Sequence, residues 1–162
     1  LGQSKRYEDD KVLTKTMINN YAKNNLLPPP VKKKYSREHM LLLVFIYYFK
    51  NMLSFHDIEA LFAPITEGHF MDASGLSLQD IYEEVFSMEY EQMKRLKEDL
   101  LRKFHASEES FTDQKEDKDY LQLFTFICAL GFDVFLKKQA MEMLIDQIRE
   151  DYPVDHSKKK KS

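Results

Sequence analysis

Turn-forming residues are scarce in this chain, and their scarcity excludes most β architectures. The 162 residues include only 4 Gly and 5 Pro, and three of the prolines are consecutive at 28–30. A sandwich or barrel of many short strands needs a tight turn after nearly every strand. The sequence therefore predicts a mostly helical fold.

The composition is that of a folded protein of about one domain. Apolar residues make up 43% of the chain, with 12 Phe, 9 Tyr and 8 Met, which is enough to form a core. The lone Cys128 excludes an internal disulfide and a multi-cysteine zinc site. No unbroken apolar run approaches the roughly 18 residues of a membrane span, and no secretion signal is visible. We expect a cytoplasmic protein that does not contact a membrane.

Charge is divided unevenly along the sequence. Residues 1–60 carry a net charge of +4, residues 61–155 carry −11, and the final seven residues carry +4 from four lysines. Residues 11–50 hold eight basic side chains and a single acid, Glu38. A basic head followed by an acidic body predicts that only the head meets a negatively charged partner.

Helical periodicity and capping residues predict the elements. A short amphipathic helix over 13–25 ends at two asparagines and the proline run. Ser36 begins an apolar helix, and the pair Ser54 and Asp57 begins another that stops before Pro64. Residues 65–76 are expected to form a loop. The pair Ser77 and Asp80 repeats the capping-box pattern and begins a long helix over 77–106. A polar connection and a last helix over about 117–151 follow.

The first helix and the loop after it carry the chemistry needed to bind DNA. Thr16, Asn19 and Asn20 lie on the polar face of the helix, where amide groups can pair with adenine edges in a major groove. Basic and hydroxyl groups that can contact phosphates lie nearby: Lys15, Lys23, Lys32, Lys33, Lys34, Tyr35 and Arg37. A solvated loop and helix face remains the alternative for each of these residues, and Tyr21 and Tyr35 can also serve in core packing.

The segments INNYAKNNLLPPPVKKKYS and LSFHDIEALF resemble the DNA-binding head of MerR-type transcriptional regulators. The matching positions are Ile18, Tyr21, Leu26, Leu27, Tyr35, Ser54, Asp57 and Ile58. Asn19 and Asn20 stand where that family has Arg-Tyr, and Asn25 stands where it has glycine. No apolar stripe precedes residue 13, so the first helix of a helix-turn-helix is either absent or upstream.

The phrase LTKTMINNYAKN with KKKYS is closer still to an uncharacterised bacterial family, domain of unknown function 1836. The resemblance implies an all-α fold with a small β wing, that is, a winged helix-turn-helix head followed by long C-terminal helices. It places a head at 12–63 and a helical dimerisation or effector lobe at 77–152. We expect residues 1–11 to form a leader, whose truncation at its start stays open, and residues 153–162 to form a disordered basic tail. Residues 77–106 resemble the helix that pairs MerR-type subunits into an antiparallel dimer.

Together these features predict a homodimeric regulator, a repressor, that binds double-stranded DNA. No catalytic residue, metal site or cofactor is expected, because the chain lacks phosphate-binding glycine motifs and its five histidines lack metal-ligand spacing. One alternative is a protein-interaction module whose basic loop binds an acidic partner. A second is a small enzyme or ligand carrier in the C-terminal lobe. The identity and existence of a small-molecule effector stay open.

Overall fold

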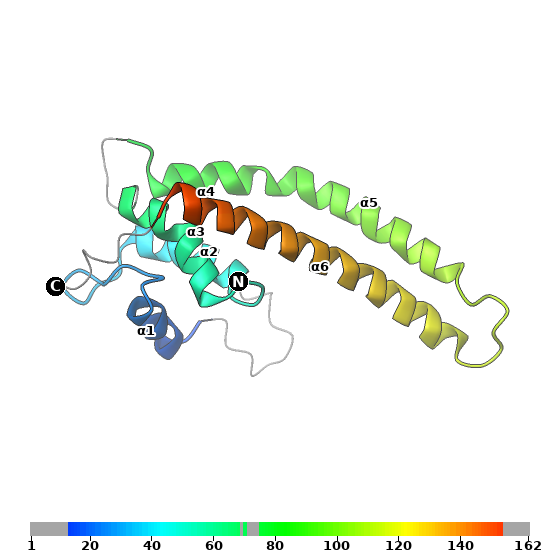
Figure 1. The fold of residues 1–162 in the computed structure, drawn as a ribbon. Helices are drawn as coiled ribbons and strands as arrows, with labels where there is room; N and C mark the ends of the chain where they lie inside the picture. Colours follow the sequence, from blue (N-terminus) through cyan, green and yellow to red (C-terminus); the bar gives the residue numbers. More distant parts are fainter. Residues whose placement is uncertain (1–12, 69, 71–74, 154–162) are drawn as a thin grey trace. The chain divides into compact units, whose positions relative to one another are not determined.

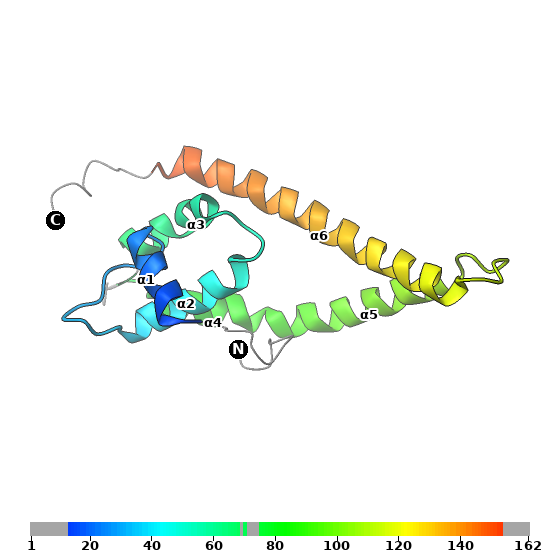
Figure 2. The same cartoon turned by 90° about the horizontal axis from the view of Figure 1, so that it is seen from below.

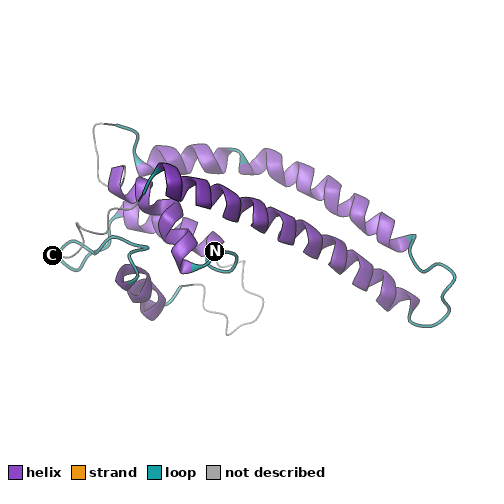
Figure 3. Ribbon diagram, viewed as in Figure 1, coloured by secondary structure: helices purple, strands orange, loops and turns teal. Residues whose placement is uncertain are grey.

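The computed structural model of the chain describes residues 13–68, 70 and 75–153 (Figure 1). This part contains α-helices and no β-strand (Figure 3). The helices are α1 (Lys15–Lys23), α2 (Arg37–Phe49), α3 (Phe55–Gly68), α4 (Leu78–Ser87), α5 (Glu89–Glu108) and α6 (Lys118–Asp151). The predicted helical class is confirmed, whereas the predicted leader and nearly all of the predicted basic tail lie outside the described residues.

The chain divides into two compact units. Unit 1 comprises residues 1–82 and 142–162, and unit 2 comprises residues 83–141. Both α4 and α6 pass from one unit into the other.

The predicted β wing is not present as strands in the described residues. The segment between α1 and α2 contains one isolated antiparallel bridge, between Val31 and Lys34. Two local features limit it to a single bridge. The prolines at 28–30 have no N–H to donate to a ladder, and only two residues separate the bridge partners.

Unit 1 is organised around the apolar α2. Phe45 and Phe49 of α2 meet Phe62 of α3, with ring centroids 5.8 and 6.0 Å apart, and Phe45 also meets Tyr82 of α4. Tyr21 of α1 approaches Phe55 at the start of α3, with centroids 6.1 Å apart. Because α2 is apolar on nearly all sides, it takes neighbours on several faces and becomes the centre of the core.

The helix α3 passes through Pro64 and ends at Gly68, so the prediction that it stops before Pro64 is wrong. Proline removes one backbone hydrogen bond from a helix interior. Here the surrounding turns bury Ile58, Ala60, Phe62 and Ala63. Packing of this face outweighs the local cost, and the predicted loop at 65–76 accordingly begins later.

The long helix expected over 77–106 consists of two helices, with a break at Met88. Just before the break, the Ser87 hydroxyl donates to the Glu84 carbonyl oxygen over 2.7 Å and competes with the helical pattern. Met88 itself keeps right-handed helical backbone angles. The break is therefore confined to one residue, Met88, where the chain forms a turn between α4 and α5 although its backbone angles remain helical.

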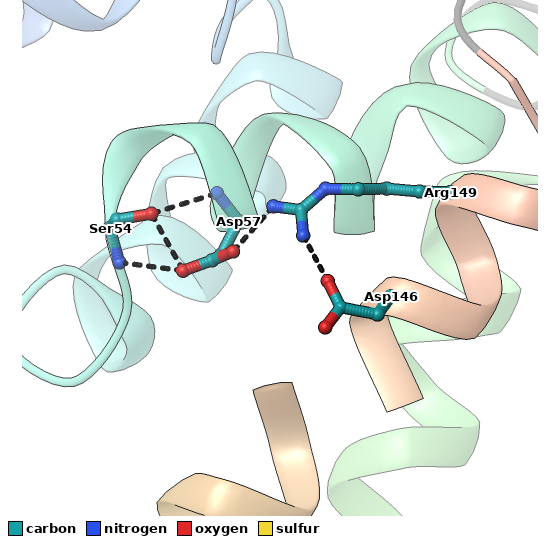
Figure 4. A network of polar contacts seen from close by, with 4 residues as sticks. All are labelled: Ser54, Asp57, Asp146 and Arg149. Carbon is teal, nitrogen blue, oxygen red and sulfur yellow. Dashed lines mark hydrogen bonds and ion pairs between the residues drawn. The ribbon is translucent and has the colours of Figure 1, made fainter. Parts of the chain in front are cut away.

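A polar network joins the start of α3 to the end of α6 within unit 1 (Figure 4). Ser54 and Asp57 form the predicted capping box, in which the Ser54 hydroxyl donates to the Asp57 carboxylate over 2.6 Å and accepts from the Asp57 N–H over 3.1 Å. The other oxygen of Asp57 accepts from Arg149, which also donates to Asp146. Burial acts to raise the pKa of Asp57, but the hydrogen bonds from Ser54 and Arg149 outweigh it and hold that pKa below its ordinary value.

Unit 2 is a hairpin of α5 and the first two thirds of α6, which run antiparallel in both views (Figures 1 and 2). Phe104 of α5 meets Phe126 of α6 edge to face, with centroids 5.5 Å apart. Lys103 of α5 forms an ion pair with Asp133 of α6. The Gln122 amide donates to the Ser110 carbonyl oxygen in the connection over 2.9 Å.

The hydropathy of α6 corrects one expectation from the sequence. An 18-residue window in this helix has a mean hydropathy of 1.5, so by length and composition alone α6 is apolar enough to cross a membrane. Single polar residues such as Gln122 and Thr125 interrupt the apolar sequence of α6. A search for unbroken apolar runs therefore does not detect the helix. Core helices of soluble proteins can pass the same test.

Candidate nucleic-acid interface

Helix α1 is held by caps at both ends. At its start the Thr14 hydroxyl accepts from the Met17 N–H over 3.1 Å. At its end Asn25 adopts a positive φ of 59°, the left-handed conformation with which many helices end. The N–H groups of Leu26 and Leu27 then both reach back to the Tyr21 carbonyl oxygen. These caps fix where α1 stops and where the loop begins.

The predicted base-reading residues lie on the exposed face of α1. Thr16, Asn19 and Asn20 are all exposed, and Lys15 and Lys23 flank them on the same side of the helix. The opposite side carries Tyr21, which is only 3% exposed. The amphipathic pattern therefore orients α1 with its amide groups toward solvent.

The three lysines of the loop form an unusual turn. Lys32 and Lys33 have positive φ values of 50° and 64°, and the Lys34 N–H donates to the Val31 carbonyl oxygen over 2.9 Å. Positive φ at both central residues is the requirement of a type I′ turn, which glycine and asparagine normally satisfy. A left-handed conformation costs roughly 1–2 kcal/mol for a residue with a side chain. Two exposed lysines thus occupy the tip of a strained turn.

His39 bridges Pro28 and Ser36, which lie before and after this lysine turn in the chain, a role that the sequence reasoning missed. Its ring is 1% exposed, and its Nδ1 accepts from the Ser36 N–H over 3.0 Å. Its Nε2 lies 3.1 Å from the Pro28 carbonyl oxygen, to which it donates in the matching neutral tautomer. The signal was available at the third position after the cap residue Ser36, where a capping box has an acceptor side chain. Because Glu or Gln usually fills that position, a histidine there was considered only as a metal ligand.

The remaining predicted phosphate contacts occupy different surroundings. Arg37 is exposed in the first turn of α2. Tyr35 is 38% exposed and packs edge to face on His39, with ring centroids 5.3 Å apart. Tyr21, by contrast, is a core residue, and burial raises the pKa of its hydroxyl. The structure thus separates the two tyrosines that the sequence left ambiguous.

Acidic side chains are sparse in this region, and the one present is hydrogen-bonded within its own helix turn. Glu38 is the only acid between residues 11 and 50. Hydrogen bonds from Ser36 and from its own backbone N–H lower its pKa, so it remains ionised at the N-terminus of α2. All ten predicted DNA-contacting residues are exposed. They lie on α1, on the lysine turn and the residue after it, and at the start of α2.

Within the part of the chain that the structure describes, no group of three or more His, Cys, Asp or Glu side chains is arranged to hold a metal ion.

The surface that combines a capped polar helix with a lysine turn is carried by an all-α head. Residues 1–85, just over half of the chain, match the family described as Domain of unknown function (DUF1836), and the chain belongs to this family. No curated protein matches the sequence, and no solved structure matches the fold.

Proposed function

We propose that the protein is a dimeric transcriptional repressor whose unit 1 binds double-stranded DNA in a MerR-like manner. Helix α1 enters the major groove and reads bases with Thr16, Asn19 and Asn20. The lysine turn, which here takes the place of the wing, contacts the flanking phosphate backbone. Residues 77–106 are the segment that resembles the MerR-type dimer helix.

The observation that carries the proposal is the lysine turn. Its backbone keeps two lysines in a conformation that costs free energy and that no core contact requires, since both side chains are exposed. Strained residues persist mainly where their geometry serves a function. Phosphate neutralisation at a fixed distance from α1 is such a function, because backbone contacts set the register of a reading helix.

The acidic composition of the rest of the chain supports one docking orientation. Residues 61–155 carry a net charge of −11, so they are repelled by DNA, whereas residues 11–50 are attracted. The basic surface of unit 1 is then the side that meets the duplex.

Salt dependence of binding to random duplex DNA tests the phosphate contacts. Six cationic side chains on six phosphates give a slope of log K against log salt of about −5. Alanine at Lys32, Lys33 and Lys34 should reduce the magnitude of this slope by about 2–3. The matched control removes three positive charges from unit 2 with Lys94→Ala, Arg95→Ala and Lys97→Ala, and it should leave the slope unchanged. Equal slopes for both triple variants would instead favour a basic loop that binds an acidic protein.

Base reading is tested separately, on an operator found by footprinting the promoter beside the protein's own coding region. Asn19→Ala combined with Asn20→Ala should cost about 1–3 kcal/mol of discrimination for each lost bidentate contact, with no change in the salt slope. Asn51→Ala, at an exposed asparagine in the turn between α2 and α3, is the control. Unchanged discrimination in the double variant would remove α1 as the reading helix.

A further inference from the structure

Helix α6 has two apolar sides within unit 2, and α5 covers only one of them. The side that faces α5 is defined by Gln122, Phe126 and Asp133, each of which contacts α5 or the connection after it. Another side carries a second apolar set at helical spacing, which we call the α6 stripe: Tyr120, Leu123, Phe124, Ile127, Gly131, Val134 and Phe135. Each side chain of the stripe is exposed by half or more.

Helix α5 does not offer a comparable free side. Ten of its twenty residues are Asp, Glu, Lys or Arg. Its apolar Phe104 contacts α6, and Met93 and Leu96 line a shallow hollow shared with Lys137 of α6. The α6 stripe is therefore an extended apolar surface in unit 2 without a partner among the described residues, and apolar patches of this kind mark interaction sites.

We propose that the α6 stripe is a dimer interface, in which it packs antiparallel against the same stripe of a second copy of the chain. This inference rests on the dimeric state included in the proposed function and assigns it to α6 rather than to residues 77–106. It does not depend on DNA contact.

The stripe is complementary to itself when reversed. With a two-fold axis at the level of Ala129, Ile127 of one copy lies opposite Gly131 of the other. The flanking pairs, which are equally spaced from that axis, are Phe124 with Val134, Leu123 with Phe135, and Tyr120 with Lys138. A two-fold interface requires this correspondence, since residue i must meet j while j meets i.

Gly131 supplies a second, independent observation. It lies in the interior of an exposed helix, where glycine costs roughly 0.5–1 kcal/mol relative to alanine. A Cβ added there would meet nothing within 4 Å in the single chain. Nothing within unit 2 explains a residue without a side chain at this position, whereas close approach of the partner's Ile127 would explain it.

Charge selects the antiparallel direction. Asp117 and Asp119, which flank Lys118, lie at the N-terminal end of the stripe, and Lys137 and Lys138 lie at its C-terminal end. Antiparallel packing places the acidic end of one copy beside the basic end of the other. Parallel packing would place like charges together.

A lipid surface is the main competing occupant, given the hydropathy of α6, and the structure disfavours it. A membrane-spanning hairpin would carry α5 into the bilayer together with its ten charged side chains. Charged residues in the hydrocarbon region are strongly unfavourable.

Sedimentation of the full chain tests the interface. The wild-type protein should sediment at micromolar concentration with twice the 19.3 kDa mass of the chain. Ile127→Lys should give a monomer with unchanged helical circular dichroism. Phe132→Lys, which adds the same charge at an exposed residue outside the stripe, should remain a dimer. A monomeric wild type, or an Ile127→Lys variant that stays dimeric, overturns the proposal.

Two further measurements separate specific packing from non-specific association. Gly131→Leu enlarges the apolar stripe, so it should strengthen association driven by apolar area alone but weaken the proposed dimer, because it fills the space of the partner's Ile127. Spin labels on Gln139→Cys in a Cys128→Ser background should lie roughly 30 Å apart in the antiparallel dimer, from twenty residues at 1.5 Å each. A stronger dimer in the first experiment, or labels within about 15 Å in the second, overturns the proposed geometry.

Flotation with phosphatidylcholine vesicles, with and without phosphatidylglycerol, tests the lipid alternative. The proposal expects no co-flotation, and a monomer that floats with either vesicle overturns it. The outcomes also separate this inference from the proposed function. A dimer that does not bind DNA contradicts the proposed DNA binding but not the α6 interface. A monomer with the predicted salt slope contradicts the dimer but not the DNA binding.

Discussion

Unit 1 and unit 2 are both helical, but they differ sharply in how much apolar surface each buries for itself. All fifteen buried apolar side chains of the described residues belong to unit 1, from Tyr21 to Ile145. Among the unit 2 residues whose burial is described, the only buried one is Ser107, while large apolar side chains such as Phe132 and Phe135 are exposed. Unit 1 has the several layers around α2 that a core needs, whereas a single helix pair can cover only one side of each helix. The difference agrees with the proposed α6 dimer interface, in which unit 2 would bury its apolar surface against a second copy of the chain.

The largest expected effect is a difference in the free energy of unfolding between two alanine variants, one in each unit. Ile46→Ala removes a fully buried side chain from α2 and should lower the free energy of unfolding by about 2–5 kcal/mol. Leu136→Ala, at a residue of α6 that is 62% exposed and outside the stripe, should change it by less than about 0.5 kcal/mol. Urea unfolding followed by circular dichroism measures both. Similar losses at the two positions would contradict the contrast between the units.

The next effect concerns two histidines. His39→Ala removes a buried ring and its hydrogen bonds to Ser36 and Pro28, so it should cost about 1–3 kcal/mol of stability. It should also weaken binding to random duplex DNA, since it releases the contacts at Pro28 and Ser36 on either side of the lysine turn. His105→Ala in unit 2, where the exposed ring contacts Glu108 and the neighbouring Phe104 ring, is the matched control and should change neither measurement. Full DNA affinity in the His39 variant would separate His39 from the proposed interface.

Acid stability should depend on Asp57 of unit 1. Its pKa is lower in the folded state than its ordinary value of about 3.9, so its contribution is complete above that pH and is lost as the pH falls through the lower, folded-state pKa. Asp57→Asn keeps an acceptor for Ser54 but removes the charge that faces Arg149, and it should cost about 1–2 kcal/mol at neutral pH. Thermal unfolding between neutral pH and about pH 2 should show a smaller acid destabilisation in this variant than in the wild type. Asp80→Asn, at an exposed carboxyl whose pKa is lowered by hydrogen bonds from Ser77, should reduce the acid dependence less than Asp57→Asn does. An unchanged pH profile for Asp57→Asn would contradict the assignment.

The smallest effect is a gain of stability with a loss of binding. Lys33→Asn places a residue that tolerates positive φ at the strained turn, so it should raise the free energy of unfolding by roughly 1 kcal/mol. It should also reduce the magnitude of the DNA salt slope by about 1. Lys34→Asn, at a residue without positive φ, should reduce the slope equally but bring no gain in stability. A Lys33 variant that is no more stable than the Lys34 variant would show that the turn is not strained.

Much of the fold could be predicted because its signals are local. The pairs Ser54 with Asp57 and Ser77 with Asp80 were expected to cap helices, and each forms a side-chain hydrogen bond of 2.6 Å. These bonds span three residues, so composition and spacing suffice to find them. The continuation of α3 through Pro64 could not be predicted in this way, because it depends on packing of Phe62 against α2.

The candidate interface was predictable to the same extent. Periodicity placed Asn19 and Asn20 on the outer face of α1, and both are exposed. Neither the left-handed backbone of Lys32 and Lys33 nor the link from His39 to Pro28 has a signature in sequence. The first is a conformation that lysine rarely adopts, and the second joins residues eleven positions apart.

The amino-acid order by itself determined where helices begin, which of their faces are polar, and where positive charge accumulates, since each follows from contacts within a turn or two of the chain. Tertiary structure alone decided which apolar faces are covered. It covered those of α2 and left one side of α6 without a neighbour in unit 2. Burial is a property of surfaces brought together from distant parts of the chain, and helices with the same periodicity can end in a core or in solvent.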